Sequence, residues 1–221
     1  MKNKELSKRI FTSSILIALL VLMLNYSFVL IGSLIMIFVF AWIEFNGMID
    51  KIIKDKNFSI KKNIFRSLIF IYLIFFSKII IDEHIENLPN ISWSLLFVII
   101  ICILTDIGGF IFGKIFKGKK LTKISPNKTY AGAIGSLFLT LIFSIIYSFS
   151  LSLTDLKVII FISILISLIS QIGDLFISYL KRKAKLKDTG DILPGHGGIL
   201  DRIDGILFAV PSGIILINYF Y

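Results

Sequence analysis

Paired carboxylates beside a glycine-rich turn are the residues of this chain best suited to chemistry. Asp201 and Asp204 are three residues apart, so a helix that begins near them places both on one face. Two such carboxylates suit a hard cation that keeps some waters and takes its remaining ligands from phosphates. The turn before them, PGHGG at 194–198, lets backbone amides approach a phosphate. A capped helix with solvated acids is the weaker alternative, because four acids lie in the run 188–204.

A second set of polar residues lies just before this run, inside an apolar stretch. Helical spacing of three and four residues places Asp174, Ser178, either Lys181 or Arg182, and Lys185 on one face. A carboxylate in an apolar helix is expensive and usually faces a cavity or a partner, which favours a functional role for Asp174. For the basic residues, anchoring of the helix end among lipid headgroups is an equally good interpretation.

A third polar cluster lies between Asp106 and Gly132. A basic loop there ends in the run SPNKT, residues 125–129, at the start of a predicted helix. Ser, Lys and Thr at a helix start can cradle a phosphate, since the helix end adds a positive field. Taken alone this pattern is weak. Anchoring at the membrane surface explains most of the lysines but not the SPNKT run.

The elements that must position these residues are membrane-spanning helices. Of the 221 residues, 56% are hydrophobic, they come in long blocks, and the mean hydropathy is +0.90. A spanning segment must satisfy its own backbone hydrogen bonds, and nothing alternates as barrel strands do, so we expect an all-α polytopic transmembrane helical bundle. A span needs about 20 apolar residues. We expect about seven spans, with six to eight acceptable, near residues 10–24, 28–45, 64–81, 91–112, 131–149, 158 to beyond 174, and 199–219. The fourth span could be broken at Gly108 and Gly109.

Basic residues indicate how these spans are oriented. The chain has 24 Lys and Arg and a formal net charge of +10. If seven helices alternate, only Lys78 and Lys157 fall on one side of the membrane. By the positive-inside rule the N-terminus and the three polar clusters face the cytoplasm, and the charge reports orientation rather than nucleic-acid binding. Residues 1–9 resemble the start of a signal peptide, but no small-residue cleavage site follows, so we expect a retained anchor. His84 lies among acids in an outer loop, where we expect it to be solvated.

The three clusters together predict metal-assisted phosphoryl or nucleotidyl transfer at a membrane surface. Such chemistry needs in-line positioning and charge neutralisation more than a protein nucleophile. It takes one lipid and one water-soluble phosphorylated substrate. A transporter or channel would favour charges near the midplane and broken helices there, whereas these acids lie at one face. The single cysteine, Cys102, excludes a disulfide within the chain, and no Walker-type phosphate loop occurs.

The run from Ser178 to Asp204 resembles the signature of the phosphatidate cytidylyltransferases, also called CDP-diacylglycerol synthases. That pattern is Ser, Lys-Arg, Lys-Asp, His-Gly-Gly and Asp-Arg-x-Asp, and every fixed position is matched. The matching residues are Ser178, Lys181-Arg182, Lys187-Asp188, His196-Gly197-Gly198 and Asp201-Arg202-Ile203-Asp204. The runs 171–175, 106–108 and 125–129 also look like the family, so the resemblance extends from about residue 100 to the end.

The resemblance implies transfer of CMP from CTP to phosphatidate, giving CDP-diacylglycerol and pyrophosphate in phospholipid biosynthesis. It implies metal binding, with Mg²⁺ as the cofactor, by Asp174, Asp201 and Asp204; a monovalent cation such as K⁺ alongside it is left open. The expected catalytic residues are Asp174, Ser178, Lys181, Arg182, Lys187, Asp188, His196 and Arg202. The residues expected to cradle the nucleotide phosphates are Ser125, Lys128, Thr129, Gly197 and Gly198. A homodimer is expected by analogy.

The chain departs from the family pattern in two ways. Many members carry Glu where this chain has Ala131, and the chain is short for the family, with the deficit placed in its N-terminal half. We expect one integral membrane domain in which residues 1–100 supply spans and residues 101–221 carry the motifs. A CTP-dependent polyprenol kinase, which transfers the γ-phosphate, is the closest rival. A CDP-alcohol phosphotransferase needs an acid-rich pattern that this sequence lacks.

Overall fold

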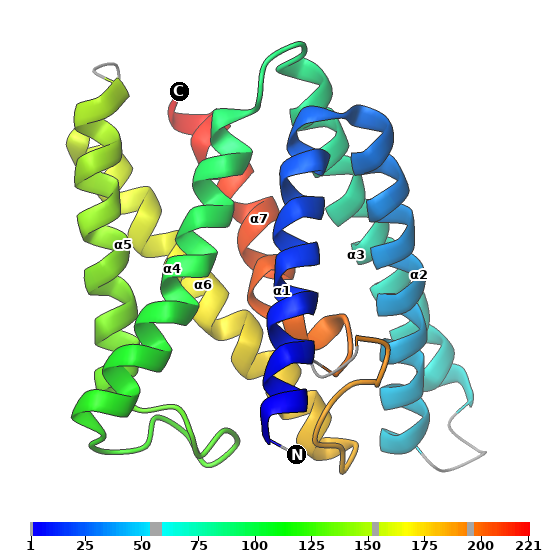
Figure 1. Ribbon diagram of the computed structural model, residues 1–221. Helices are drawn as coiled ribbons and strands as arrows, with labels where there is room; N and C mark the ends of the chain where they lie inside the picture. Colours follow the sequence, from blue (N-terminus) through cyan, green and yellow to red (C-terminus); the bar gives the residue numbers. More distant parts are fainter. Residues whose placement is uncertain (1, 54–58, 152–154, 194–196) are drawn as a thin grey trace. The chain divides into compact units, whose positions relative to one another are not determined.

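The computed structural model describes residues 2–53, 59–151, 155–193 and 197–221. Within these ranges the chain is all-helical, and its helices are α1 (Lys2–Asn25), α2 (Ser27–Ile52), α3 (Ser59–Glu86), α4 (Trp93–Phe116), α5 (Tyr130–Leu151), α6 (Leu156–Lys183) and α7 (Leu200–Phe220) (Figure 1). Six of them, α2 to α7, are long and apolar enough to cross a membrane, and the apolar part of α1, Phe11–Asn25, is shorter. The predicted all-α polytopic membrane fold is therefore confirmed.

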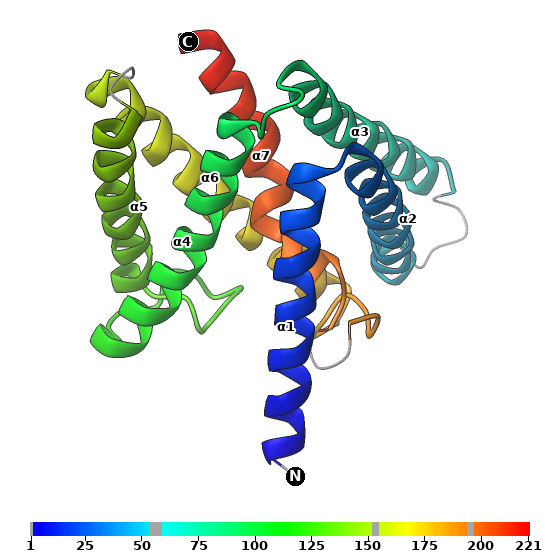
Figure 2. The ribbon, with the colours of Figure 1, turned by 45° about the horizontal axis from the view of Figure 1, so that its top comes forward.

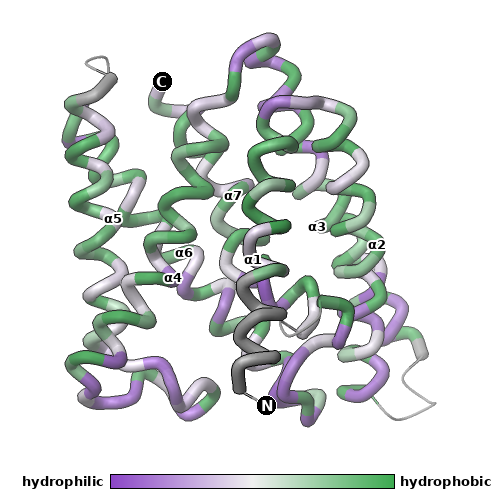
Figure 3. Tube along the Cα trace, in the orientation of Figure 1, coloured by the Kyte–Doolittle hydropathy of each residue, from purple (hydrophilic) through white to green (hydrophobic). Residues whose placement is uncertain are grey.

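The distribution of apolar residues explains why these segments are helical. Figure 3 shows hydrophobic residues along the helices and hydrophilic residues in the loop between α4 and α5. Large apolar side chains such as Phe28, Phe110 and Phe149 are exposed, as lipid-facing side chains are. Where lipid replaces water, a helix satisfies every backbone group within the segment. The chain is thus an integral membrane protein.

The chain packs as two compact units. Unit 1 comprises Met1–Ser92 and Leu180–Ile203, and unit 2 comprises Trp93–Tyr179 and Asp204–Tyr221. In unit 1, α2 packs against α1 and α3, and in unit 2, α4 lies along α5 (Figures 1 and 2). The last turn of α6 and the first turn of α7 belong to unit 1. The predicted division into residues 1–100, which supply spans, and residues 101–221, which carry the motifs, is a different division from these two units. It stays a prediction.

Unit 1 buries His84, which we expected to be solvated. The His84 side chain is 2% exposed, because α3 extends to Glu86 and does not end in a loop before it. Its Nε2 lies 3.0 Å from the Ser27 Oγ at the start of α2. The expectation from sequence was therefore wrong, since acidic neighbours in the sequence did not mean a solvated segment.

Glycines in unit 2 let α4 and α5 approach closely. A Cβ added at Gly108 would lie 2.7 Å from the Ser136 Cα, and one at Gly132 would lie 2.7 Å from the Gly109 carbonyl oxygen. Small residues are the usual means of close helix packing in membranes. Helix α4 continues without a break through Gly108 and Gly109, although the sequence allowed a break there. These glycines instead permit close packing of α4 against α5.

Buried hydroxyl groups join both of these helices to α6. Ser144 Oγ on α5 lies 2.5 Å from Ser163 Oγ, and Thr105 Oγ1 on α4 donates to Ser167 Oγ at 2.9 Å. Hydrogen bonds between helices contribute to association in lipid, where apolar contacts alone give no hydrophobic driving force. They fix the helix that carries Asp174 within unit 2.

Helices α6 and α7 also meet in unit 2 through small residues. A Cβ added at Gly173 would lie 2.8 Å from the Asp204 carbonyl oxygen, and one at Gly205 would lie 3.1 Å from the Ser170 carbonyl oxygen. The backbones can touch there only because neither glycine has a side chain. The crossing brings the backbone next to Asp174 against the backbone of Asp204.

Candidate active site

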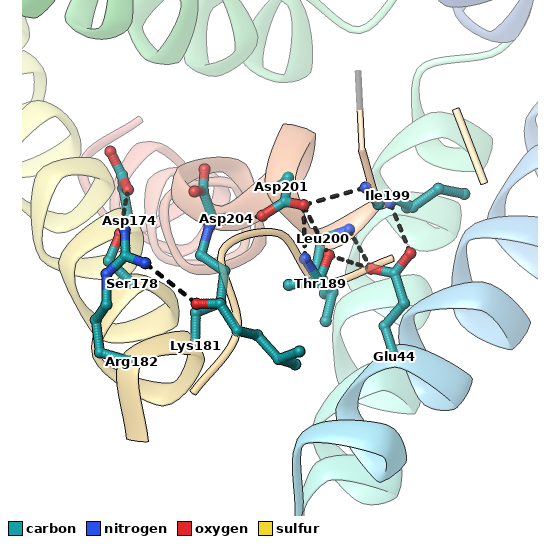
Figure 4. Close-up of polar contacts among 12 residues, drawn as sticks. Glu44, Asp174, Ser178, Lys181, Arg182, Thr189, Ile199, Leu200, Asp201 and Asp204 are labelled. Atoms are coloured by element: carbon teal, nitrogen blue, oxygen red, sulfur yellow. Dashed lines mark hydrogen bonds and ion pairs between the residues drawn. The ribbon is translucent and has the colours of Figure 1, made fainter. Parts of the chain in front are cut away.

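Asp201, in the first turn of α7, lies in a hydrogen-bond network of unit 1 (Figure 4). Its Oδ1 accepts from Lys181 Nζ at 2.6 Å. Its Oδ2 accepts from the backbone N–H of Thr189 at 2.8 Å and from that of Gly198 at 3.1 Å. The Asp201 side chain is 6% exposed and that of Lys181 is 12% exposed. Because charge-assisted hydrogen bonds are the strong ones, Asp201 ties the last turn of α6 and the segment around Thr189 to the start of α7.

Glu44, on α2, is a second carboxylate of this network (Figure 4). Its Oε1 accepts from the N–H of Ile199 and its Oε2 from the N–H of Leu200, both at 2.9 Å. Oε2 also lies 2.7 Å from Thr189 Oγ1, which is 3.0 Å from Asp201 Oδ2. A hydroxyl has one proton, so Thr189 donates it to one of these carboxylates at a time.

Glu44 was not predicted from the sequence as a functional residue. Glu44 is the one acid of the apolar run 28–45. An acid within an apolar helix was also the pattern that pointed to Asp174, and applied here it could have found Glu44. What the sequence does not indicate is the partner, which lies more than 140 residues away along the chain.

The amides of Gly197 and Gly198 donate to acceptors within the protein itself. The N–H of Gly197 donates to the Leu193 carbonyl at 3.2 Å, and the N–H of Leu193 donates to the Gly197 carbonyl at 2.9 Å. The N–H of Gly198 already donates to Asp201. A phosphate would have to replace these acceptors, and the phosphate-binding role of Gly197 and Gly198 stays a prediction. His196 lies outside the described residues.

A second carboxylate–lysine pair lies in unit 2. Lys128 Nζ forms an ion pair with Asp174 Oδ2, and both side chains are 26% exposed. Ser178 Oγ donates to Asp174 Oδ1 at 3.3 Å, one helical turn further along α6. The fold thus joins the SPNKT run to the acid of α6, two features that are separate in the sequence.

Backbone hydrogen bonds within the loop that carries Lys128 fix its conformation. The N–H of Leu121 donates to the Lys128 carbonyl at 2.8 Å, and the N–H of Lys128 donates to the Ser125 carbonyl at 3.1 Å. Thr129 Oγ1 accepts from the N–H of Gly132 at 3.1 Å, so Thr129 caps the N-terminus of α5. Ser125 and Thr129 therefore have structural roles that hold Lys128, and their contact with a phosphate stays a prediction.

Other predicted catalytic residues lie exposed on unit 1. These are Arg182, Lys187, Asp188 and Arg202. Arg182 Nη1 donates to the Leu186 carbonyl at 3.1 Å, which ties its guanidinium to the end of α6. Since guanidinium carries five donors, this single bond leaves others for a phosphate. Their catalytic roles stay predictions.

Known proteins are similar to this chain over part or nearly all of its length. A sequence model of the Cytidylyltransferase family matches residues 1–220. The chain belongs to the cytidylyltransferase family. The protein of Helicobacter pylori named phosphatidate cytidylyltransferase is 40% identical over 127 residues, which are 57% of this chain and 47% of that protein. The proteins of that name in Staphylococcus haemolyticus and Staphylococcus saprophyticus are 42% identical over 125 residues and 43% identical over 128 residues; each match covers 56% of this chain and 48% of the relative.

The family that residues 178–204 resemble is thus confirmed. The chain spans about half the length of the curated relatives it matches. The similarity therefore identifies the family, and the reaction, substrates and partners of this shorter chain are matters for proposal.

The carboxylates differ in how well they fit a metal ion. Among the residues that the structure describes, no group of three or more His, Cys, Asp or Glu side chains is arranged to hold one. The predicted ligands are divided, since Asp201 belongs to unit 1 and Asp174 and Asp204 belong to unit 2. Asp174 fits a hard cation, because a partly exposed carboxylate with few donors keeps lone pairs for it. The shared metal site stays a prediction.

Asp201 fits a metal ion less well. A carboxylate offers about four lone-pair sites, and the Asp201 oxygens meet Lys181 Nζ, two backbone N–H groups and the Thr189 hydroxyl. A cation at Oδ2 would have to displace a donor, and a cation at Oδ1 would meet the positive charge of the Lys181 ammonium. Lys181 Nζ donates to Oδ1, so the Lys181 ammonium is the group that a cation at Oδ1 would displace.

Proposed function

We propose that this chain transfers CMP from CTP to phosphatidate, forming CDP-diacylglycerol and releasing pyrophosphate. The observation that carries the proposal is the cytidylyltransferase match over residues 1–220, to which the relatives named phosphatidate cytidylyltransferase add the substrate. The six long apolar helices support a lipid substrate, since they would place the protein in the bilayer where phosphatidate lies.

The proposed reaction is a direct displacement at the α-phosphorus of CTP. A phosphate oxygen of phosphatidate forms the new P–O bond, and the bond from the α-phosphorus to the pyrophosphate oxygen breaks. No protein nucleophile is required. The protein's task is to align two anionic substrates and to neutralise their charge.

Lys128 and Lys181 suit the task of charge neutralisation. Each is held by an ion pair with an aspartate, Asp174 and Asp201 respectively. An ammonium group has three donors, so each lysine keeps donors for a phosphate oxygen while the aspartate fixes its position. Arg182 and Arg202 add exposed positive charge for the pyrophosphate portion of CTP.

Asp174 and Asp204, which both belong to unit 2, are the residues we assign to hold Mg²⁺. Bound Mg²⁺ supplies charge stabilisation at the transferring phosphate without proton transfer. The meeting of α6 and α7 at Gly173 and Asp204 supports this assignment, because it brings the backbones that carry these two acids together.

The motif-bearing loops are proposed to face the cytoplasm, where CTP is available. The support is the gathering of basic residues on one side of the alternating helices. Reporter proteins fused after Ile53 and after Ala184 should both report a cytoplasmic location, and an external location of either would contradict this orientation. A homodimer is proposed from the resemblance alone, and sedimentation in detergent would test it.

Labelled CTP tests the reaction directly. The purified protein, in vesicles that contain phosphatidate and with Mg²⁺ present, is given CTP labelled at the α- or the γ-phosphorus. We expect lipid to gain the label only from the α position, with release of labelled pyrophosphate from the γ position. Lipid labelled only from the γ position would instead identify a CTP-dependent lipid kinase and overturn the proposal.

A further inference from the structure

We propose that Glu44 of α2 is a positioning residue for the active-site loop, and that it acts through Thr189 and the start of α7 on Asp201. Its link to catalysis rests on the proposed function. Its link to loop order rests on the geometry of unit 1 alone, so the two can be tested separately.

Glu44 occupies the N-terminus of α7 as an anion supplied by the protein itself. Glu44 is 4% exposed, and its carboxylate accepts from the N–H groups of Ile199 and Leu200, each at 2.9 Å (Figure 4). The first N–H groups of a helix have no partner within the helix, and the helix dipole favours a negative charge there. A buried carboxylate is costly unless it is hydrogen-bonded. Glu44 and the helix start therefore satisfy each other.

Two glycines leave the space that the Glu44 carboxylate fills. A Cβ added at Gly190 would lie 2.9 Å from Glu44 Oε1. A Cβ added at Gly198 would lie 2.6 Å from both Glu44 oxygens. These glycines come from two different segments of the loop. Both segments are thus built around Glu44, which is an observation independent of the hydrogen bonds.

Glu44 reaches the signature residues through Thr189. The Thr189 hydroxyl lies 2.7 Å from Glu44 Oε2, while the Thr189 N–H donates to Asp201 Oδ2 at 2.8 Å. Asp201 in turn holds Lys181 Nζ at 2.6 Å. A displacement of Thr189 or of the start of α7 therefore moves Asp201 and the Lys181 ammonium. A helix of the N-terminal half, expected to supply only a span, has a direct part in the site.

The test compares Glu44→Gln and Glu44→Asp with a matched control, Glu83→Gln. Glu83 is 3% exposed, also lies in unit 1 and accepts from Ser92 Oγ at 2.6 Å. Because α3 pairs with the far end of α2 through His84 and Ser27, Glu83 is roughly 25 Å from Glu44 along the helix axis. The full chain is reconstituted in lipid nanodiscs, and kcat and the KM values for CTP and for phosphatidate are measured for each variant.

We expect Glu44→Gln to lower kcat by about 10- to 100-fold, the range found when a group that orients an active-site ligand is removed. KM for phosphatidate should not change. Glu44→Asp keeps the charge and should recover part of kcat, whereas Glu83→Gln should stay within about twofold of the unmodified chain. If Glu44 had a purely structural role, Glu44→Gln would lower the yield of folded protein, and the folded fraction would not show a reduced kcat with an unchanged KM.

A spin label gives a readout that needs no catalysis. Cys102 is buried and is replaced by Ala, and Ile192, which is 38% exposed in the loop, is replaced by Cys and labelled. We expect Glu44→Gln to increase label mobility and Glu83→Gln to leave it unchanged. If the unmodified chain transfers no CMP, the proposed function fails while the label still tests the positioning.

The proposal is overturned if Glu44→Gln keeps the label spectrum of the unmodified loop. It is also overturned if the label becomes mobile while kcat stays unchanged, since the loop order would then have no consequence for transfer. Increased mobility together with reduced kcat, and partial recovery of both in Glu44→Asp, supports it.

Discussion

The two lysine–aspartate pairs use the same residue types in different environments. In unit 1, Lys181 and Asp201 are 12% and 6% exposed, and the Asp201 oxygens also meet two backbone amides and a hydroxyl. In unit 2, Lys128 and Asp174 are both 26% exposed, and Asp174 has in addition the longer contact from Ser178. The first carboxylate is committed to holding the loop together, while the second keeps capacity for a ligand. The two aspartates, both predicted as metal ligands, are therefore not equivalent.

The largest expected effect on activity is that of Asp174→Asn. If Asp174 helps to hold Mg²⁺, the substitution should lower kcat by roughly 10³-fold, the order of loss when an electrostatic group aimed at the transition state is removed. The thermal midpoint in detergent should change little, because a partly exposed ion pair contributes about 0–1 kcal/mol. The matched control is Asp155→Asn before α6, where Asn can replace Asp as a cap. Substantial turnover by Asp174→Asn would remove it from the metal site.

Asp201→Asn should reduce stability as well as activity. The substitution leaves the Lys181 ammonium buried without its carboxylate, and breaking a buried pair costs about 3 kcal/mol. We expect a clear fall of the thermal midpoint and a roughly 10- to 100-fold loss of kcat, as for other groups that orient a site. The double variant Lys181→Gln with Asp201→Asn should recover much of the midpoint but not the activity. An unchanged thermal midpoint in Asp201→Asn would contradict the view that Asp201, unlike Asp174, stabilises the fold.

The fold was predictable because its physical cause is local. Each expected span corresponds to one helix, although the spans at 91–112 and 199–219 were expected to begin slightly before α4 and α7 do. A long apolar run in lipid needs no distant partner to become helical. The role of Gly108 and Gly109 was not predictable in the same way. A glycine in a helix can mark a break or a close approach, and only the neighbouring helix decides between them.

The candidate site was predictable by residue type but not by partner. The acids and lysines of the candidate site were predicted from the sequence, yet the pairing of Lys128 with Asp174 depends on how α6 packs in unit 2. Glu44 was missed because its partners, Thr189 and the start of α7, lie far away in the chain. The glycines of the turn were taken as room for a phosphate, and the structure places a protein carboxylate against Gly198. Glycines before a helix start indicate that an anion can bind there, but they do not indicate whether it is a phosphate or a carboxylate of the protein.

Lys128→Gln and Lys181→Gln sharpen the comparison at the level of the cations. Lys128→Gln should raise KM for CTP about tenfold, because one charge-assisted contact to a phosphate is lost. It should leave the thermal midpoint unchanged, because Asp174 is partly exposed to solvent. Lys181→Gln should lower the midpoint as well, since it leaves the Asp201 charge buried. Steady-state kinetics and thermal unfolding of the two variants side by side test this. Equal loss of midpoint in both would contradict it.

The smallest expected effect is that of Asp50→Asn. Asp50 Oδ1 accepts from both Lys62 Nζ and Arg66 Nη2 at 2.8 Å, so it makes more ion pairs than Asp201 does. Its side chain is 48% exposed, however, and solvent screens such pairs to about 0–1 kcal/mol. We expect the thermal midpoint to stay nearly constant and kcat to remain within about twofold. A loss as large as that of Asp201→Asn would mean that the number of ion pairs, rather than burial and backbone donors, sets the strength of a carboxylate in this protein.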